Sequence, residues 1–305
     1  MEQILATTIR SAAPLVLVAM AGVFAFRAGI FHLGLEGLMI TGAFTTVAVG
    51  EATGSVEFGI LAAIGVCMAL SVLYWWVIGP LGANVIIAGL GLTSIGLGGT
   101  AFALGAIYDQ RGSLFTDTVL PRPVSGITSG PGIIISDQSI LVWLTPLIVL
   151  AAWVVLRRSR FGLRLAAAGE YPFAARSLGV SPQIIKLQAL LIAGALCALG
   201  GAELSVGALR NFTENMTNGR GFIAFVAVIF GAWHPIGSAL AGLFFGLADA
   251  IGIQSQINVT ERVPREFVLM IPFVLTIFAV WLGGLWRRRS LEAEAGYAEL
   301  REPDH

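Results

Sequence analysis

Several polar side chains that could do chemistry lie inside or beside long apolar runs of the sequence. Glu36, Glu203 and Asp249 are acids in such runs, and Asn84 and Arg220 stand at the edges of two others. Exposing a charge to lipid costs on the order of 2–3 kcal/mol, so these groups are candidates for facing a solute path. For the three acids the alternative is a structural role, such as Glu36 pairing with backbone amides at the start of a broken helix.

Amides and aromatic rings near the same runs would suit an uncharged polar solute with a flat ring. The amides are Asn211, Asn215 and Asn218, and the rings are Phe31, Phe212, Phe222 and Trp233. Anchoring at the membrane interface or packing in the core is the simpler explanation for each ring taken alone.

The motifs of several other chemistries are missing from the sequence. The one lysine, Lys186, is followed by Leu187, whereas the phosphate-binding loop of an ATPase needs Gly-Lys-Ser/Thr. There is no HExxH pair, paired acidic metal motif or GxSxG elbow, and the spacing of His234 and Ser238 is weak evidence for a base and a nucleophile. We therefore expect no catalytic residue, no metal site and no cofactor bound by this chain.

The composition is that of an integral membrane protein. Apolar residues make up 56% of the chain, charged residues 12%, and the mean hydropathy is +0.85, outside the range of soluble domains. An all-α, polytopic transmembrane bundle of about eight to ten membrane segments is expected. The charge-poor segments are 11–27, 37–50, 57–79, 84–107, 140–156, 187–209, 221–233, 236–256 and 266–286. Those at 37–50 and 221–233 are short, which favours broken or re-entrant helices.

Basic residues in short loops predict the orientation in the bilayer. The loop 157–186 carries six basic residues and one acid, and three arginines stand at 287–289, so both regions are expected in the cytoplasm. The four segments from 187 to 286 supply the required even number of crossings if each one crosses. The loop 109–139 then lies outside. We expect one membrane domain at 1–289 and a polar tail at 290–305; the zero net charge indicates no nucleic-acid partner.

Small residues are frequent in the apolar segments. The 38 glycines, many at small-residue spacings, predict a tightly packed bundle. Cys67 and Cys197 lie in apolar runs and are expected to pack as small side chains without a disulfide. The short stretches 34–44 and 219–233 are loosely alike, which leaves room for an inverted repeat.

The basic loop contains RFGLRLAAAGEYPFAARSLGV, which predicts a short Ala-rich helix followed by Gly179 and Pro182. Such a helix could lie across the membrane face and receive a partner; an ordinary positive-inside loop is the alternative. The stretch resembles the coupling loop of permease subunits of bacterial ABC importers, the family shared by ribose-type, branched-chain amino acid and nucleoside systems. FRAGIFHLGLEGLMITGAF, GANVIIAGLGL and NMTNGRGFIAFVAVIFGAWHPIGSALAGLFFGLADA match in order, so the resemblance covers roughly residues 20–255.

The last of these stretches is most similar to permeases paired with nucleoside-binding lipoproteins, also described as simple-sugar permeases. Two positions depart from the family pattern, which commonly has Asn where His32 and Thr93 stand. Both bear on substrate identity, so we add them to the pathway candidates. The full set is Phe31, His32, Glu36, Asn84, Thr93, Asn211, Phe212, Asn215, Arg220 and Trp233.

The resemblance also implies an assembly. Such importers combine two permeases, here expected to form a heterodimer, with ATP-binding subunits that hold ATP and Mg, and with an extracytoplasmic solute-binding protein. The helix around 170–179 would sit in a cleft of the ATP-binding subunit, so that nucleotide-driven closure switches the permease between inward- and outward-facing states. The residues implied in this contact are Arg164, Glu170, Ala174, Ala175, Arg176, Ser177 and Gly179. For Arg157, Arg158 and Arg160, lipid headgroup anchoring is the preferred interpretation.

We therefore expect a multi-pass permease subunit of an ATP-driven importer in the bacterial inner membrane, passing nucleosides or related small polar solutes. A sugar importer and an ATP-independent carrier are the alternatives.

Overall fold

The structure, a computed structural model, describes residues 2–109, 112–127, 131–258 and 274. The chain divides into two units, 1–250 and 251–305. The first unit contains almost all of the described residues; of the second, only the end of one helix and Val274 are described. The expected segment at 266–286 apart from Val274, the arginines at 287–289 and the expected tail at 290–305 lie outside the described residues.

The described chain is mainly helical, as the composition predicts, and each of the first eight expected segments forms a helix. Six of these helices are long and apolar enough to span a bilayer, counting only the described residues. The α-helices are α1 (Glu2–Arg27), α2 (Leu35–Thr53), α3 (Val56–Ile78), α4 (Val85–Tyr108), α5 (Ile140–Arg158), α6 (Arg160–Glu170), α7 (Pro172–Ser177), α8 (Pro182–Ala202), α9 (Arg220–Phe230) and α10 (Pro235–Asn258). A 3-10 turn, η1 (Pro131–Ile134), and a π-helical turn, η2 (Glu203–Leu209), complete the helical elements.

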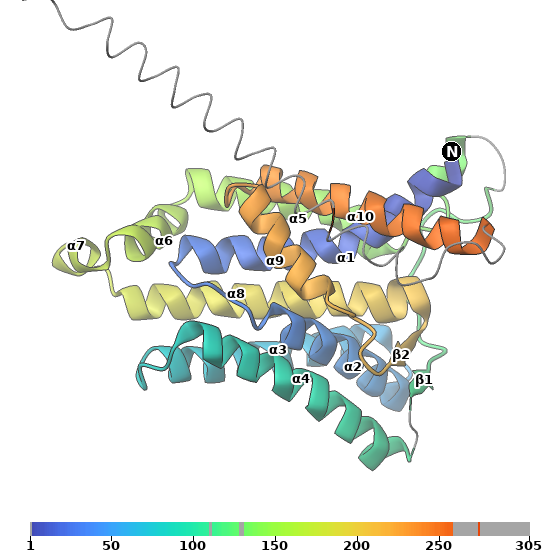
Figure 1. The fold of residues 1–305 in the computed structure, drawn as a ribbon, viewed down its shortest axis with the longest axis horizontal. Coiled ribbons are helices and arrows are strands. Elements are labelled where there is room, and N and C mark those ends of the chain that lie inside the picture. Colours follow the sequence, from blue (N-terminus) through green and yellow to red (C-terminus); the bar gives the residue numbers. More distant parts are fainter. Residues whose placement is uncertain (1, 110–111, 128–130, 259–273, 275–305) are drawn as a thin grey trace, which may run out of the picture. The chain divides into compact units, whose positions relative to one another are not determined.

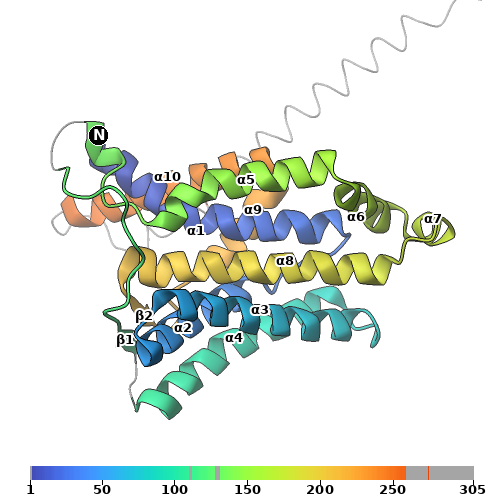
Figure 2. The ribbon, with the colours of Figure 1, turned by 180° about the vertical axis from the view of Figure 1, so that it is seen from behind.

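One small sheet departs from the all-α expectation. β1 (Ser113–Phe115) pairs antiparallel with β2 (Asn211–Thr213), with Leu114 opposite Phe212. The sheet lies at the opposite end of the bundle from α6 and α7, as both views show (Figures 1 and 2). The loop 109–139 and the loop 157–186 are therefore at opposite ends, which agrees with the predicted topology.

The short segments at 37–50 and 221–233 belong to two interrupted crossings. α1 ends at Arg27, residues 28–34 continue without helix, and α2 then runs toward the β1–β2 end (Figure 1). In the second crossing the chain returns from β2 through 214–219, and α9 runs toward the α6–α7 end. With 11 residues, α9 is about 16 Å long and cannot cross a ~30 Å core alone. This short helix agrees with the expectation of a broken or re-entrant helix at 221–233, because the non-helical residues 214–219 supply the rest of its path.

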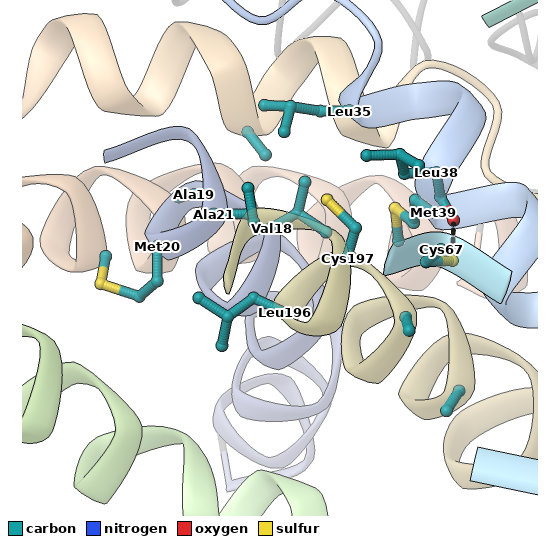
Figure 3. Packing of buried hydrophobic residues seen from close by; sticks show 14 of the residues in the cluster. Val18, Ala19, Met20, Ala21, Leu35, Leu38, Met39, Cys67, Leu196 and Cys197 are labelled. Atoms are coloured by element: carbon teal, nitrogen blue, oxygen red, sulfur yellow. Dashed lines mark hydrogen bonds between the residues drawn. The ribbon is translucent and has the colours of Figure 1, made fainter. Parts of the chain in front are cut away.

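Close helix packing surrounds α2, which contacts α3, α4, α8 and α9. A Cβ added at Gly37 would lie 2.5 Å from the Leu92 carbonyl oxygen, and one at Gly42 would lie 2.7 Å from the Ala198 Cα. Figure 3 shows side chains of α1, α2, α3 and α8 interlocking in this core. Cys67 and Cys197 are both buried and free, and the Cys67 thiol donates to the Leu38 carbonyl at 3.2 Å.

The basic loop differs from the expected single helix at 170–179. Glu170 is the last residue of α6, Tyr171 leaves the helical conformation, and Pro172 begins α7. The break follows from the sequence, because a residue that precedes proline is disfavoured in the α conformation. Gly179 has a φ of 77°, which lets the chain reverse after α7 before Pro182 opens α8.

Candidate translocation and coupling site

The N-termini of the two interrupted helices meet at Glu36. Its carboxylate is buried and accepts hydrogen bonds from the Thr217 hydroxyl at 2.5 Å, the Gly219 N–H at 2.9 Å and the Gly221 N–H at 2.5 Å. The first turn of a helix has unpaired N–H groups and carries the positive end of the helix dipole. A carboxylate there accepts hydrogen bonds from the N–H groups and is stabilised by the dipole. Glu36 thus joins the start of α2 to the start of α9, and this geometry matches the structural alternative for that residue.

His32 and Thr93 lie beside this junction. Thr93 donates to the Leu33 carbonyl at 3.2 Å, which fastens the non-helical segment 28–34 to α4. The His32 ring is fully buried and stacks on Tyr74 of α3, with ring centroids 4.5 Å apart and an interplanar angle of 12°. Neither imidazole nitrogen has a hydrogen-bond partner among the residues that the structure describes. Tyr74 carried no signal in the sequence, because it stands within an apolar run.

Phe31 and Trp233 are brought together around a ring that the sequence reasoning missed. Phe26 lies edge-on to Phe31 at 4.7 Å and stacks with Trp233 at 6.1 Å, and Phe225 completes the group at 5.3 Å from Phe26. Phe31 and Trp233 are each about half exposed. The Trp233 carbonyl accepts a hydrogen bond from Arg27 Nε at 3.3 Å, so this aromatic cluster is fixed to the end of α1.

Arg220 and Asp249 form an ion pair between α9 and α10. Arg220 Nη2 lies 3.0 Å from Asp249 Oδ2, and Arg220 Nη1 donates to the Met216 carbonyl at 3.3 Å. Asn215 and Asn218 are exposed in the turn that precedes α9. These residues lie next in sequence to the Glu36 contacts, so polar groups concentrate where α9 begins.

Three other pathway candidates lie elsewhere. Asn84 caps α4 by accepting hydrogen bonds from the N–H groups of Ile86 and Ile87. Phe212 is fully buried in β2 and packs edge-on against Phe44 at 5.1 Å. Asn211 is partly buried in the same strand, and its side chain donates to Thr213. The predicted pathway residues therefore fall into two groups. Most lie around the starts of α2 and α9, whereas Asn84 caps a helix and Asn211 and Phe212 belong to the small sheet.

Glu203 lies toward the β1–β2 end, away from the α9 junction. One oxygen of its buried carboxylate accepts from the Ser139 hydroxyl, which also accepts from the Val142 N–H at 3.3 Å. The residue thereby ties η2 to the start of α5. This arrangement is the structural role that was the alternative for this acid.

The residues expected to contact an ATP-binding subunit are gathered on α6, α7 and the turn after α7. Arg164, Glu170, Ala174, Arg176, Ser177 and Gly179 are exposed. Ala175 is buried, so the expectation that it allows close approach of a partner is not supported by its position. Sequence reasoning missed the most exposed apolar side chains here, Phe173 at 83% and Leu178 at 82%. An open hollow of about 430 Å³ adjoins α7 and is lined by Arg176, Gly179, Val180, Ser181, Pro182 and Gln183.

A backbone contact joins this surface to the rest of the bundle. Gly29 and Gly169 pack without side chains between them, since a Cβ at Gly29 would lie 3.0 Å from the Gly169 carbonyl oxygen. Gly169 precedes the last residue of α6, and Gly29 is the second residue of the segment 28–34 that leads to Glu36. The exposed surface on α6 and α7 is thus connected to the α2–α9 junction through the contact of Gly169 with Gly29 and the segment that follows Gly29.

The pair His234 and Ser238 does not form a base and a nucleophile. The Ser238 N–H donates to the His234 carbonyl at 2.8 Å, while the buried Ser238 hydroxyl has no hydrogen-bond partner in the described part of the chain. Burial, then the positive charges of Arg157 and Arg27, lower the pKa of the His234 imidazole. Among the residues that the structure describes, no three potential metal-ligating side chains come together.

Comparison with known proteins agrees with this architecture. Residues 4–280 match the family model of the branched-chain amino acid transport system permease component. The guanosine ABC transporter permease protein NupQ of Bacillus subtilis is 34% identical over 91% of this chain and 90% of its own. The nucleoside ABC transporter permease protein NupC of Lactococcus lactis is 32% identical over 93% of each chain. The glucose ABC transporter permease protein TsgB13 of Haloferax volcanii is 28% identical over 88% of this chain and 74% of its own.

No solved structure matches the chain. The family model covers most of the sequence and both interrupted crossings, and the two bacterial relatives span nearly the same length. The chain therefore belongs to the permease component family of branched-chain amino acid transport systems and is a multi-pass permease subunit of an ABC importer of the bacterial cytoplasmic membrane.

Proposed function

We propose that this permease passes nucleosides, delivered by an external solute-binding protein, and that α6 and α7 form the surface on which the ATP-binding subunit docks. As a permease of an ABC importer, the chain works with an ATP-binding subunit and a solute-binding protein and does not hydrolyse ATP itself. The observation that carries the substrate proposal is the similarity, over almost the whole chain, to relatives named for guanosine and nucleosides.

The structure is compatible with a nucleoside path. A nucleoside has a flat ring that stacks on aromatic faces and a sugar that needs hydrogen-bonding groups. The aromatic cluster of Phe26, Phe31, Phe225 and Trp233 offers two half-exposed rings. Asn215, Asn218 and Arg220 supply polar groups at the start of α9.

The docking proposal rests on apolar exposure outside the membrane spans. Phe173 on the short helix α7 and Leu178 directly after it are exposed in a loop rich in arginine, where water would otherwise surround them. Large apolar side chains exposed together usually mark a protein interface. Arg164, Glu170 and Arg176 lie around them and provide charged groups for the rim of that interface.

The substrate proposal is tested by uptake. The chain is co-expressed with its ATP-binding subunit and a second permease, which we expect to be a non-identical chain, and reconstituted with the solute-binding protein in vesicles. We expect ATP-dependent uptake of radiolabelled guanosine and no uptake of glucose. Uptake of guanosine without any ATP-binding subunit would contradict the importer mechanism.

A glucose importer is the second candidate, because a glucose permease is 28% identical to the chain. ATP-dependent uptake of glucose in place of guanosine would support this candidate and overturn the nucleoside proposal.

The docking proposal has its own measurement. Replacing Phe173 and Leu178 together with serine should reduce co-purification of the ATP-binding subunit severalfold, because the apolar contacts at the centre of the interface are lost. Asp117→Asn is the matched control, since Asp117 is exposed in the loop at the opposite end. Unchanged co-purification of the double variant would place the interface elsewhere.

A further inference from the structure

The Arg220–Asp249 pair has an unusual position for a surface ion pair. It is the single salt bridge among the residues that the structure describes, and its two side chains remain 22% and 26% exposed. Both residues stand on helices of the membrane bundle, and neither is in a loop.

The depth of the pair follows from helix lengths. Arg220 is the first residue of α9 and lies about 15 Å along the helix from Phe230 at its other end. Asp249 lies about 21 Å along α10 from Pro235. Phe230 and Pro235 flank the same short turn, so both charges lie more than two helical turns from it along apolar helices. Charged groups on membrane helices are rarely turned toward lipid and instead face a water-filled cavity or another protein surface.

The atoms that remain free on the pair are suited to a hydroxyl-bearing ligand. Arg220 is held by Asp249 Oδ2 and by the Met216 carbonyl, so its guanidinium is fixed. Asp249 Oδ1 accepts no hydrogen bond from any residue that the structure describes. The exposed amides of Asn215 and Asn218 stand in the adjoining turn, where both residues have left-handed backbone conformations, with φ values of 57° and 44°. Such conformations cost free energy in residues other than glycine and recur at functional sites.

We propose that Arg220, Asp249 and the amides of Asn215 and Asn218 form a binding site along the translocation path, and that this site binds the vicinal hydroxyls of a ribose ring. A carboxylate has enough acceptor capacity for two neighbouring hydroxyls, and in dinucleotide sites an acidic side chain accepts a hydrogen bond from the ribose 2′-hydroxyl. This inference rests on the proposed nucleoside function, because it assigns the sugar half of that solute.

The competing explanation is that the ion pair only ties α9 to α10. The two explanations predict different results when the charges are exchanged. The double variant Arg220→Asp/Asp249→Arg can still form an ion pair between α9 and α10. It does not restore a ribose site, because the carboxylate has moved to the other helix. A second distinction between the two explanations comes from comparing solutes with and without the vicinal ribose hydroxyls.

The test uses the reconstituted complete importer with guanosine and 2′,3′-dideoxyguanosine, which lacks the vicinal 2′- and 3′-hydroxyls and keeps the 5′-hydroxyl. For the native protein we expect faster uptake of guanosine. Asp249→Asn should lower guanosine uptake about tenfold, since a charge-assisted hydrogen bond is lost, and change uptake of the dideoxy compound less than about twofold. The exchanged double variant should remain as poor with guanosine as Asp249→Asn.

Asn218→Ala provides a variant that leaves the ion pair intact. It should lower guanosine uptake about threefold without lowering uptake of the dideoxy compound. Equal losses for both solutes in Asp249→Asn, with recovery in the exchanged variant, would show a structural tie and overturn the inference. Failure of the native importer to take up either compound would instead count against the nucleoside function itself.

Discussion

At the scale of single residues, Glu36 shows how an intramembrane charge can be held by backbone. Three donors, two from the turn before α9 and one from its first turn, converge on one buried carboxylate. No other acid described in the bundle accepts this number of hydrogen bonds. The sequence identified Glu36 as a residue that needs a partner, and also named broken-helix amides as that partner, but it could not identify α9 as their source because 181 residues separate Glu36 from Thr217.

Replacing Glu36 with glutamine should loosen the junction. The amide side chain carries no charge and presents an NH2 group to at least one N–H donor, which then stays unsatisfied. We expect a loss of about 1–3 kcal/mol in the free energy of unfolding and a lower thermal midpoint of the purified protein in detergent. Glu57→Gln is the control, because Glu57 is exposed at the start of α3. Equal midpoints for the two variants would show that the carboxylate is not required to hold α9.

His32 presents the opposite case, a buried polar ring without partners. Replacing it with phenylalanine keeps the stack on Tyr74 and removes two unpartnered nitrogens, so the variant should be more stable by about 1–2 kcal/mol. His32→Ala should be less stable by about 2–4 kcal/mol because it leaves a cavity. Thermal unfolding measures both changes. A destabilised phenylalanine variant would mean that the imidazole nitrogens form favourable polar contacts in the native protein.

At the scale of elements, local signals in the sequence account for most helix boundaries. Ser55, Asn84 and Ser139 cap the starts of α3, α4 and α5, and Pro172 and Pro182 open α7 and α8. Apolar runs gave the positions of the membrane helices. They could not show that α1 begins near residue 2, because its first turns are polar. They did favour a broken or re-entrant helix at 221–233, but could not show that the non-helical stretch lies between β2 and α9. Those features depend on packing between distant elements.

Glycine spacing offers a sharp test of that packing on α4. A Cβ at Gly96 would overlap the backbone of Gly37 on α2, whereas one at Gly98 would meet open space. Gly96→Ala should therefore push α4 from α2 and lower stability by about 1–3 kcal/mol. Gly98→Ala should be neutral or slightly stabilising, because alanine favours the helix over glycine. Thermal midpoints of the two variants make the comparison within one helix, and similar midpoints would contradict the close approach of α2 and α4.

At the scale of the whole molecule, a short chain of contacts in the first unit connects the surface that we propose for docking to the polar groups around Glu36. Gly169 at the end of α6 touches Gly29, the chain continues through His32 and Leu33, and Glu36 then holds α9. The sequence predicted the coupling residues and the pathway candidates on separate segments. The link between them was not visible, because a contact of two glycines leaves no side-chain pattern and joins positions far apart in the chain.

This route leads to a prediction about energy coupling. A Cβ at Gly169 would overlap the Arg27 carbonyl oxygen, so Gly169→Ala should separate α6 from the segment 28–34 while leaving Phe173 and Leu178 exposed for docking. Since coupling requires that movement of one element bias another, we expect the variant importer to bind its ATP-binding subunit and hydrolyse ATP, but to take up solute at least about fivefold more slowly. ATP hydrolysis and uptake are measured on the same vesicles.

Gly65→Ala on α3 is the matched control for this prediction, because a Cβ there meets open space and both changes add one methyl group to a helix. The control should keep the native ratio of solute transported to ATP hydrolysed. If Gly169→Ala kept that ratio as well, the force from the docked subunit would have to reach α9 by a path that avoids the Gly29–Gly169 contact, such as the packing of α6 on α8. If the Gly169→Ala variant instead failed to bind the ATP-binding subunit, Gly169 would belong to the docking surface. The contact between Gly169 and Gly29 would then no longer explain how ATP hydrolysis is coupled to solute transport.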